Sequence, residues 1–202
     1  MQKVLIQKQE VGCMYRKFYK TVVLFIIIVF FAGCTSYNKK VQTCVENPEY
    51  VQTYSKTFSL TKGSRVGVLP FDCRVQFIGS TISENTVRNM ANLGIDFIDS
   101  LELTQIMKKK NAYYHGLAKA RDYDKIIKLA DLDYLMVGDV QIYSPRRKRI
   151  ISATVHILDG NGDPVVKVRF EPPSGRWKMP AIGVVLAKAI KKELKKQGYV
   201  GP

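Results

Sequence analysis

The chain has 202 residues, a formal net charge of +15 and 46% apolar residues. This length allows one ordinary domain with an N-terminal appendage, and the apolar fraction excludes a wholly disordered chain. The positive charge favours acidic partners such as nucleic acid, anionic lipid or acidic cell-wall polymers, but it does not indicate a fold.

The first element in the chain is an apolar segment near the N-terminus. Residues 21–32 carry no charge, and three basic residues come just before them: Arg16, Lys17 and Lys20. The run is long enough for the hydrophobic region of a secretory signal and shorter than the roughly 18 apolar residues of a membrane-spanning helix. We therefore expect export, with translation starting at Met1 or at Met14.

The apolar segment ends at Phe31-Ala32-Gly33-Cys34, which resembles the lipobox of bacterial lipoproteins. The resemblance implies that residues 1–33 are a signal peptide cleaved before Cys34 and that this cysteine carries lipid, including palmitate. An uncleaved membrane anchor and a signal peptide with an incidental cysteine are the alternatives.

The residue after the cysteine predicts the destination. Thr35 stands where an Asp would resemble an inner-membrane retention signal, so we expect a periplasm-facing protein anchored to the outer membrane. One acyl chain alone anchors only marginally, so stable attachment needs several chains on Cys34. Export also argues against nucleic acid as a partner.

Residues 34–56 read as a lipidated N-terminus and polar tether, interrupted by Pro48. Within and after it, Cys44 and Cys73 form an even pair in an oxidising compartment. The sequence leaves open whether they form a disulfide or remain two separate thiols. The folded domain is predicted to span residues 57–202.

The first half of this domain alternates strands and helices. We expect a buried strand over 65–71 and a helix that Thr81-Ile82-Ser83-Glu84 opens as a capping box and Gly94 ends. A strand over 95–99 follows, then a helix capped by Ser100 that ends near Lys110. A further helix is predicted over 122–130.

The second half predicts three strands and a helix. Strands are expected over 134–143, 150–159 and 165–170, the last two joined by a hairpin turn at 160–162. Pro180 begins a long amphipathic helix that Gly198 stops, with its lysines facing solvent. Together these elements predict an α/β fold: a single-domain sandwich in which helices flank a mixed β-sheet.

An ordered set of motifs resembles a known superfamily. The motifs are Val66 to Phe71 (VGVLPF), the helix around Leu103 to Met107, the segment Ala130 to Val140, and the hairpin Val155 to Val165. In this order they resemble the CsgG-like, TolB N-terminal-like lipoprotein domain, which includes the curli-secretion lipoprotein and LpoB-type activators of penicillin-binding proteins. The curli-secretion members carry additional long membrane hairpins. No connection here is long enough for two such strands, so the resemblance implies an accessory domain more than a channel.

The sequence offers little for catalysis. It contains no phosphate-binding GxxxxGK[ST] loop, no GxGxxG, no HExxH and no GxSxG motif. His115 and His156 are the only histidines; His156 is expected to face outward from its strand, and neither is assigned a catalytic or ligand role. Asp159, Asn161 and Asp163 have calcium-loop spacing, but Pro164 replaces the glycine such a loop needs, so a hairpin turn is favoured. We expect no enzyme, no metal and no cofactor apart from the covalent lipid.

Two features could bind a partner. Arg146, Arg147, Lys148 and Arg149 form a basic loop that could contact anionic lipid or glycan, or could simply be solvated. Trp177 could anchor a partner or pack onto the sheet. The expected function is a non-enzymatic outer-membrane lipoprotein that binds another envelope protein and assists envelope assembly or secretion. The alternative is one subunit of an oligomeric, CsgG-like secretion ring.

Overall fold

The computed structural model describes residues 40–58, 60–143, 149–174 and 177–199. The chain divides into a unit from Met1 to Gln42 and a unit from Thr43 to Pro202. Residues 40–46 are helical. The sheet and all the elements described below belong to the second unit.

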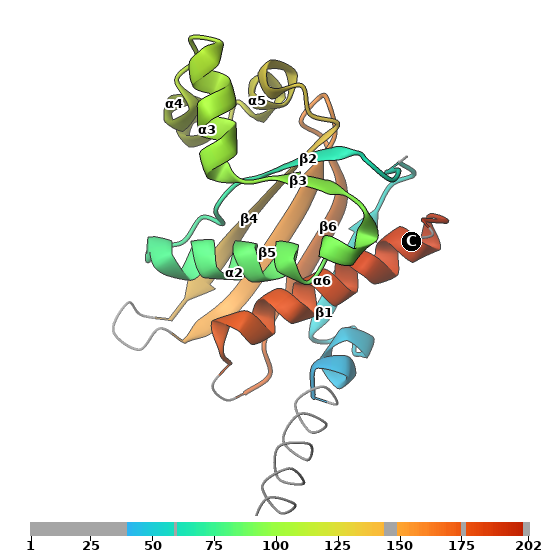
Figure 1. Cartoon of the computed structure of the whole chain (residues 1–202). Coiled ribbons are helices and arrows are strands. Elements are labelled where there is room, and N and C mark those ends of the chain that lie inside the picture. Colours follow the sequence, from blue (N-terminus) through green and yellow to red (C-terminus); the bar gives the residue numbers. More distant parts are fainter. Residues whose placement is uncertain (1–39, 59, 144–148, 175–176, 200–202) are drawn as a thin grey trace, which may run out of the picture. The chain divides into compact units, whose positions relative to one another are not determined.

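A six-stranded mixed sheet forms the centre of this unit (Figure 1). Its strands are β1 (Val51–Ser55), β2 (Arg65–Val68), β3 (Asp96–Ile98), β4 (Tyr134–Ile142), β5 (Ile150–Leu158) and β6 (Pro164–Phe170). Their spatial order is β1-β6-β5-β4-β2-β3. The strand β2 runs parallel to both β3 and β4, and all other neighbours are antiparallel.

Helices cover the two faces of the sheet unequally. They are α2 (Gln76–Arg88), the 3₁₀ turn η1 (Ala91–Leu93), α3 (Ser100–Lys109), α4 (Tyr114–Ala120), α5 (Tyr123–Ala130) and α6 (Met179–Lys196). On one face α2 and α6 pack against each other and against the sheet (Figure 1). On the other face, Leu135 and Val137 of β4 share a buried cluster with side chains of α3, α4 and α5. The predicted α/β sandwich is confirmed.

Most predicted elements of the second half are confirmed within a residue or two. The alternation of β5 and β6 places their apolar residues toward α6, where Val155, Val166 and Val168 are fully buried. The α6 residues expected to face inward are buried as predicted. The strands β5 and β6 and the helix α6 could be predicted because each buries an apolar face, and hydrophobic periodicity is the primary sequence signal for secondary structure.

The predicted tether over 34–56 contains structure. Its last part forms β1, which pairs with β6 from Val51 opposite Phe170 to Ser55 opposite Val166. Only Val51 of this strand is an apolar, buried residue, so hydrophobic alternation could not reveal it. The hydroxyls of Thr53 and Ser55 instead donate hydrogen bonds to the buried carboxylate of Glu193 in α6.

The predicted N-caps of two helices are wrong, and α2 ends at Arg88, whereas Gly94 ends the 3₁₀ turn η1. The helix α2 begins at Gln76, five residues before the expected capping box, and Val75 caps it without a side-chain hydrogen bond. Burial of Ile78 and Ile82 holds this helix in place, so its start does not depend on a cap. The cap of α3 is Asp99, one residue before Ser100: its Oδ1 accepts from the amides of Leu101 and Glu102 at 2.8 and 2.9 Å.

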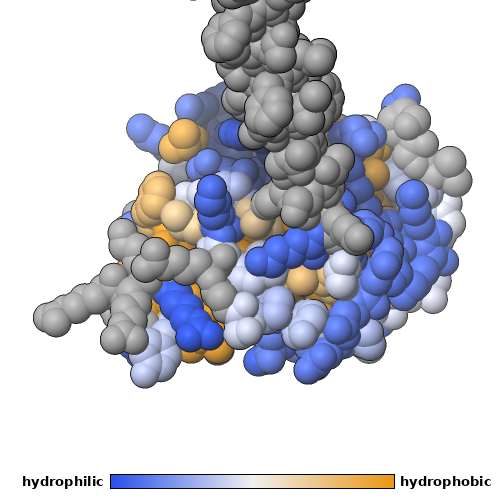
Figure 2. Space-filling model, turned by 90° about the horizontal axis from the view of Figure 1, so that it is seen from below, coloured by the Kyte–Doolittle hydropathy of each residue, from blue (hydrophilic) through white to orange (hydrophobic). Residues whose placement is uncertain are grey.

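The surface of the protein reflects its basic composition. Hydrophilic side chains cover much of the face in Figure 2, and hydrophobic side chains show as smaller patches between them. Among the described helices, none combines the length and apolarity needed to cross a membrane.

A buried carboxylate connects α6 to the edge of the sheet. Glu193 is 3% exposed, and its oxygens accept hydrogen bonds from Thr53 at 2.8 Å, Ser55 at 3.1 Å and Lys196 at 2.7 Å. Burial alone raises the pKa of Glu193, but these three hydrogen bonds and the charge of Lys196 outweigh burial, so the pKa lies below its ordinary value. The ionised carboxylate therefore holds β1 against α6.

We expect Glu193→Ala to lower the free energy of unfolding by about 1–3 kcal/mol, because it leaves two hydroxyls of β1 without their acceptor. Since the folded pKa of Glu193 is lowered, its contribution is present above its unfolded pKa of about 4.3 and is lost as pH falls through the folded value. Urea unfolding at several pH values measures this. The matched control is Glu84→Ala, at an exposed carboxylate of α2; equal losses in both variants would contradict the role of Glu193.

Candidate binding cleft

The order of the strands creates a natural position for a binding site. The chain leaves β2 for β3 on one side and later returns to β4 on the other side, so the parallel connections diverge at β2. Such a switch point leaves a crevice at the carboxyl ends of the strands. A cleft of about 1050 Å³ lies here, lined by residues that follow β2 and β3 and by the middle of β4.

The segment after β2 forms one wall of this cleft. It continues beside β4: the amide of Leu69 donates to Met136 at 3.0 Å, and the amide of Asp72 donates to Gly138 at 2.8 Å. Pro70 has no amide hydrogen and interrupts this ladder. The bridge between Asp72 and Asp139 is parallel, which places two carboxylate side chains next to each other on the cleft side.

Phe71 fixes this wall by close packing. Its side chain is 2% exposed, and a Cβ on Gly138 would lie 2.8 Å from its ring. On the opposite side, a Cβ on Gly79 of α2 would lie 1.8 Å from the Phe71 carbonyl oxygen. The helix α2 and the strand β4 can approach Phe71 only because both positions lack a side chain.

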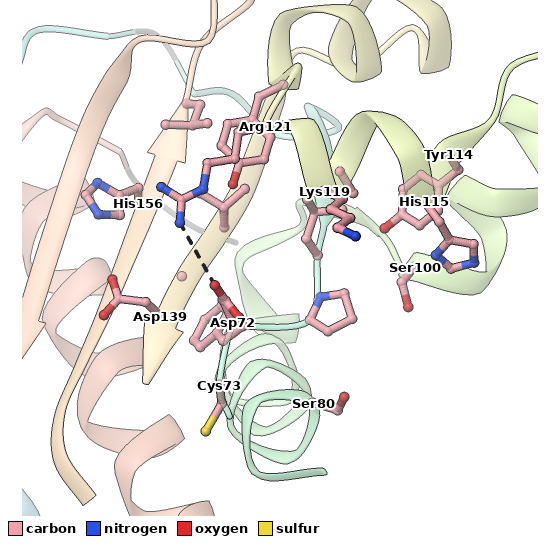
Figure 3. A pocket seen from close by; sticks show the side chains of 18 of the residues that line it. Asp72, Cys73, Ser80, Ser100, Tyr114, His115, Lys119, Arg121, Asp139 and His156 are labelled. Atoms are coloured by element: carbon pink, nitrogen blue, oxygen red, sulfur yellow. Dashed lines mark ion pairs between the residues drawn. The ribbon is translucent and has the colours of Figure 1, made fainter. Parts of the chain in front are cut away.

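Charged side chains gather at one end of the cleft (Figure 3). The guanidinium of Arg121 lies 4.0 Å from the carboxylate of Asp72, and both side chains are mostly exposed. Arg121 ends α4 with a φ of 59°, a left-handed conformation that is uncommon for residues other than glycine. In Figure 3 His156 and Asp139 lie beside this pair, on neighbouring strands.

Burial shifts the acid–base behaviour of the cleft. The pKa of His156 is lowered, first by burial and then by the charge of Lys167, with Asp139 acting in the opposite direction. The imidazole is therefore neutral at pH 7. Burial, helped by Asp99, raises the pKa of Tyr114 to about 12, so its hydroxyl stays a hydrogen-bond donor.

The rim of the cleft is partly apolar. Leu101, at the start of α3, lines the cleft and is 75% exposed. Tyr113 is also 75% exposed, and its ring lies 6.3 Å from that of His115, another lining residue. The cleft thus combines carboxylate acceptors, cationic donors and exposed apolar groups, an arrangement suited to binding. Among the described residues no group of three or more His, Cys, Asp and Glu side chains could hold a metal ion.

Neither Arg149 nor Trp177, the two sequence-predicted partner residues that the structure describes, lines this cleft. Arg146, Arg147 and Lys148 lie outside the described residues, and Arg149 is exposed just before β5. Trp177 is half-buried: its ring lies 5.2 Å from that of Phe170 at an angle of 75°, and its indole Nε1 donates to the carbonyl of Pro173 at 3.3 Å. Trp177 thus packs onto the sheet, which is one of the two positions expected for it. Partner binding by Trp177 and by the basic loop 146–149 stays a prediction.

The cysteines have different outcomes. Cys34 lies outside the described residues. Cys44 is buried and Cys73 is half-buried in the cleft wall, and no disulfide joins them in the described part of the chain. In this structure Cys44 and Cys73 are two separate thiols. A disulfide formed between them by oxidation stays a prediction.

Sequence reasoning missed three charged residues of the cleft, Asp72, Arg121 and Asp139, and gave no role to His156, which lines the cleft. Two signals were available. Asp72 follows the carboxyl end of the first parallel strand, and Asp139 is the one acidic residue of the largely apolar strand β4. Arg121 gave no such signal, because it caps α4, a seven-residue helix that the sequence did not predict.

The fold and the cleft define an α/β sandwich domain with an open, mixed-charge binding cleft. No protein-family model matches the chain, and no curated protein matches it. Several solved structures are similar over about two thirds of its length, among them the following three. A variant of the PelC dodecamer from Paraburkholderia phytofirmans is 13% identical, with 69% of this chain and 94% of that chain covered and a TM-score of 0.46.

The PelC dodecamer itself, from the same organism, is 14% identical over 69% of this chain and 93% of that chain, with a TM-score of 0.42. The lipoprotein GNA1162 from Neisseria meningitidis is 12% identical over 64% of this chain and 96% of that chain, with a TM-score of 0.44. At these values the likeness defines neither a family nor a function for this chain.

We expect Gly79→Ala to destabilise the domain by about 3 kcal/mol or more, because the new methyl group would overlap the Phe71 carbonyl and force α2 away from the sheet. Gly160→Ala is the matched control, since a Cβ there meets nothing within 4 Å. Thermal unfolding followed by circular dichroism compares the two. Equal melting temperatures would show that α2 is not close-packed against Phe71.

Proposed function

We propose that this chain is a non-enzymatic lipoprotein of the cell envelope whose α/β domain binds another envelope protein in the cleft after β2. The observation that carries the proposal is the cleft itself, with mixed charges at one end and exposed apolar side chains at its rim. The lipobox ending at Cys34 supports export and anchoring, with the outer membrane as the destination.

A protein partner fits the rim better than a small ligand does. Leu101 lines the cleft and is 75% exposed, and Tyr113, whose ring lies 6.3 Å from that of the lining residue His115, is exposed to the same degree. Burial of these two side chains against a partner would be favourable. Charged groups beside them, here Asp72 and Arg121, suit the polar edge of a protein–protein interface. Assistance to envelope assembly or secretion is the role that such a tethered binding domain would serve.

A second candidate function is one subunit of an oligomeric secretion ring. The observation that favours it is the position of β1 as the outermost strand of the sheet, with Tyr54 51% exposed. An edge strand presents backbone groups that a second copy of the chain could pair. Size-exclusion chromatography with light scattering separates the candidates: a closed ring supports the second, and a monomer supports the first.

Anchoring is tested at the cysteine. Cys34→Ser should prevent incorporation of labelled palmitate and move the protein from the membrane fraction to a soluble or uncleaved form. Cys44→Ser is the control, because it removes a thiol of the folded unit and should leave membrane attachment unchanged. A wild-type chain that incorporates no palmitate would exclude the lipoprotein assignment.

Partner binding is tested at the rim. In cells, crosslinking followed by mass spectrometry should capture an envelope protein with the wild-type chain. The double variant Leu101→Ala/Tyr113→Ala should weaken that capture at least tenfold, since buried apolar anchors dominate most interfaces. Tyr143→Ala removes a comparably exposed aromatic residue before the 144–148 segment and should have no effect. Equal capture by all three chains would place the interface elsewhere.

A further inference from the structure

The solvent side of α6 carries a compact row of positive charges. Residues spaced three, four and seven apart share one face of a helix, and Lys188, Lys191, Lys192 and Lys195 have this spacing. At 1.5 Å per residue, they occupy about 10 Å along the helix axis. We call these four residues the lysine stripe.

Three lysines of the stripe, Lys191, Lys192 and Lys195, form no ion pair within the described residues. Lys192 and Lys195 are exposed. Lys191 donates to the neutral side chain of Asn92. The one acidic residue of α6, Glu193, is buried, points toward β1 and pairs with Lys196, so it forms no ion pair with Lys191, Lys192 or Lys195.

The helix itself does not account for this arrangement. Cations in the last turn of a helix are favoured by its dipole, which explains Lys195 and Lys196. Lys188, Lys191 and Lys192 lie beyond the reach of that effect, and their mutual repulsion is unfavourable. Burial, and after it the positive charge of Lys195, lowers the pKa of Lys191.

We propose that the lysine stripe docks the domain on the anionic phospholipid headgroups of the membrane that holds its lipid anchor. The proposal rests on the proposed anchoring through Cys34. A lipid chain and a polybasic surface together give stable membrane attachment where either alone is marginal. Lysine clusters on amphipathic helices bind anionic lipid surfaces in this way.

The chemistry of the stripe favours a lipid surface over other polyanions. Lysine ammonium groups are point charges without the planar geometry that recognises one phosphate in a fixed orientation. The stripe contains no aromatic side chain, whereas sequence-tolerant binding of single-stranded nucleic acid depends on stacking. A short row of point charges is complementary to a plane of diffuse negative charge.

The test uses the chain from residue 34 with Cys34→Ser, which carries no lipid and retains the whole unit from Thr43 to Pro202. Sedimentation measures its binding to vesicles of phosphatidylethanolamine and phosphatidylglycerol. The triple variant Lys191→Gln/Lys192→Gln/Lys195→Gln should bind about 100-fold more weakly, at roughly fivefold per lysine. The corresponding triple Arg variant should bind as the parent chain does, and added salt should weaken both.

The matched control removes the same number of charges elsewhere. Lys108, Lys109 and Lys110 are exposed at the end of α3, and their triple Gln variant should keep nearly all vesicle binding. Equal losses in the two Gln triples would overturn the proposal, since net charge alone would then explain binding. Absence of binding by the parent chain, or binding to pure phosphatidylcholine vesicles, would also overturn it.

These outcomes are independent of the anchoring experiment. The vesicle assay uses chains without lipid, so it can fail while Cys34 is palmitoylated in cells, and it can succeed while palmitate is absent. The substituted side chains lie on the solvent side of α6, so we expect the helix to stay intact in each variant. Circular dichroism checks this.

Discussion

The close packing of Phe71 is the contact on which the arrangement of this domain depends. Its carbonyl occupies the space that Gly79 leaves open on α2, and its ring occupies the space above Gly138 of β4. This contact sets the distance of α2 from the sheet, and α6 packs on α2 in turn. The same segment then directs Asp72 into the cleft, so one apolar residue links the core to the candidate binding surface.

The elements that the sequence predicted well are those with a clear pattern of apolar residues. The strands β5 and β6 and the helices α5 and α6 show apolar residues at the spacing of their secondary structure, whereas β4 begins with a continuous apolar run that is buried throughout. The strand β1 could not be found in this way, because its attachment depends on hydrogen bonds from Thr53 and Ser55 to a residue about 140 positions later in the chain. The start of α2 also depends on tertiary burial, so the local capping pattern was misleading.

The cleft was harder to predict than the fold for a similar reason. Its polar side chains Asp72, Arg121, Asp139 and His156 come from a loop, the end of a short helix and two strands, and the order of the strands brings them together. An aspartate after a strand has no special meaning until the neighbouring strands are known to run parallel to it. The stripe on α6, by contrast, follows from helical spacing alone, although only the structure showed that Glu193 points inward to β1.

The attachment of β1 has a mechanical consequence for an anchored chain. Tension that arises between a membrane and the domain would reach β1 before the other five strands of the sheet, because β1 is the first strand of the described chain. The strand is held by its ladder with β6 and by the carboxylate of Glu193 on α6, so the load would pass into two elements at once. A strand that is bonded both to its neighbour and to a helix resists being pulled away from the edge of the sheet. Because acid would protonate the Glu193 carboxylate, the mechanical resistance of this edge would fall at low pH.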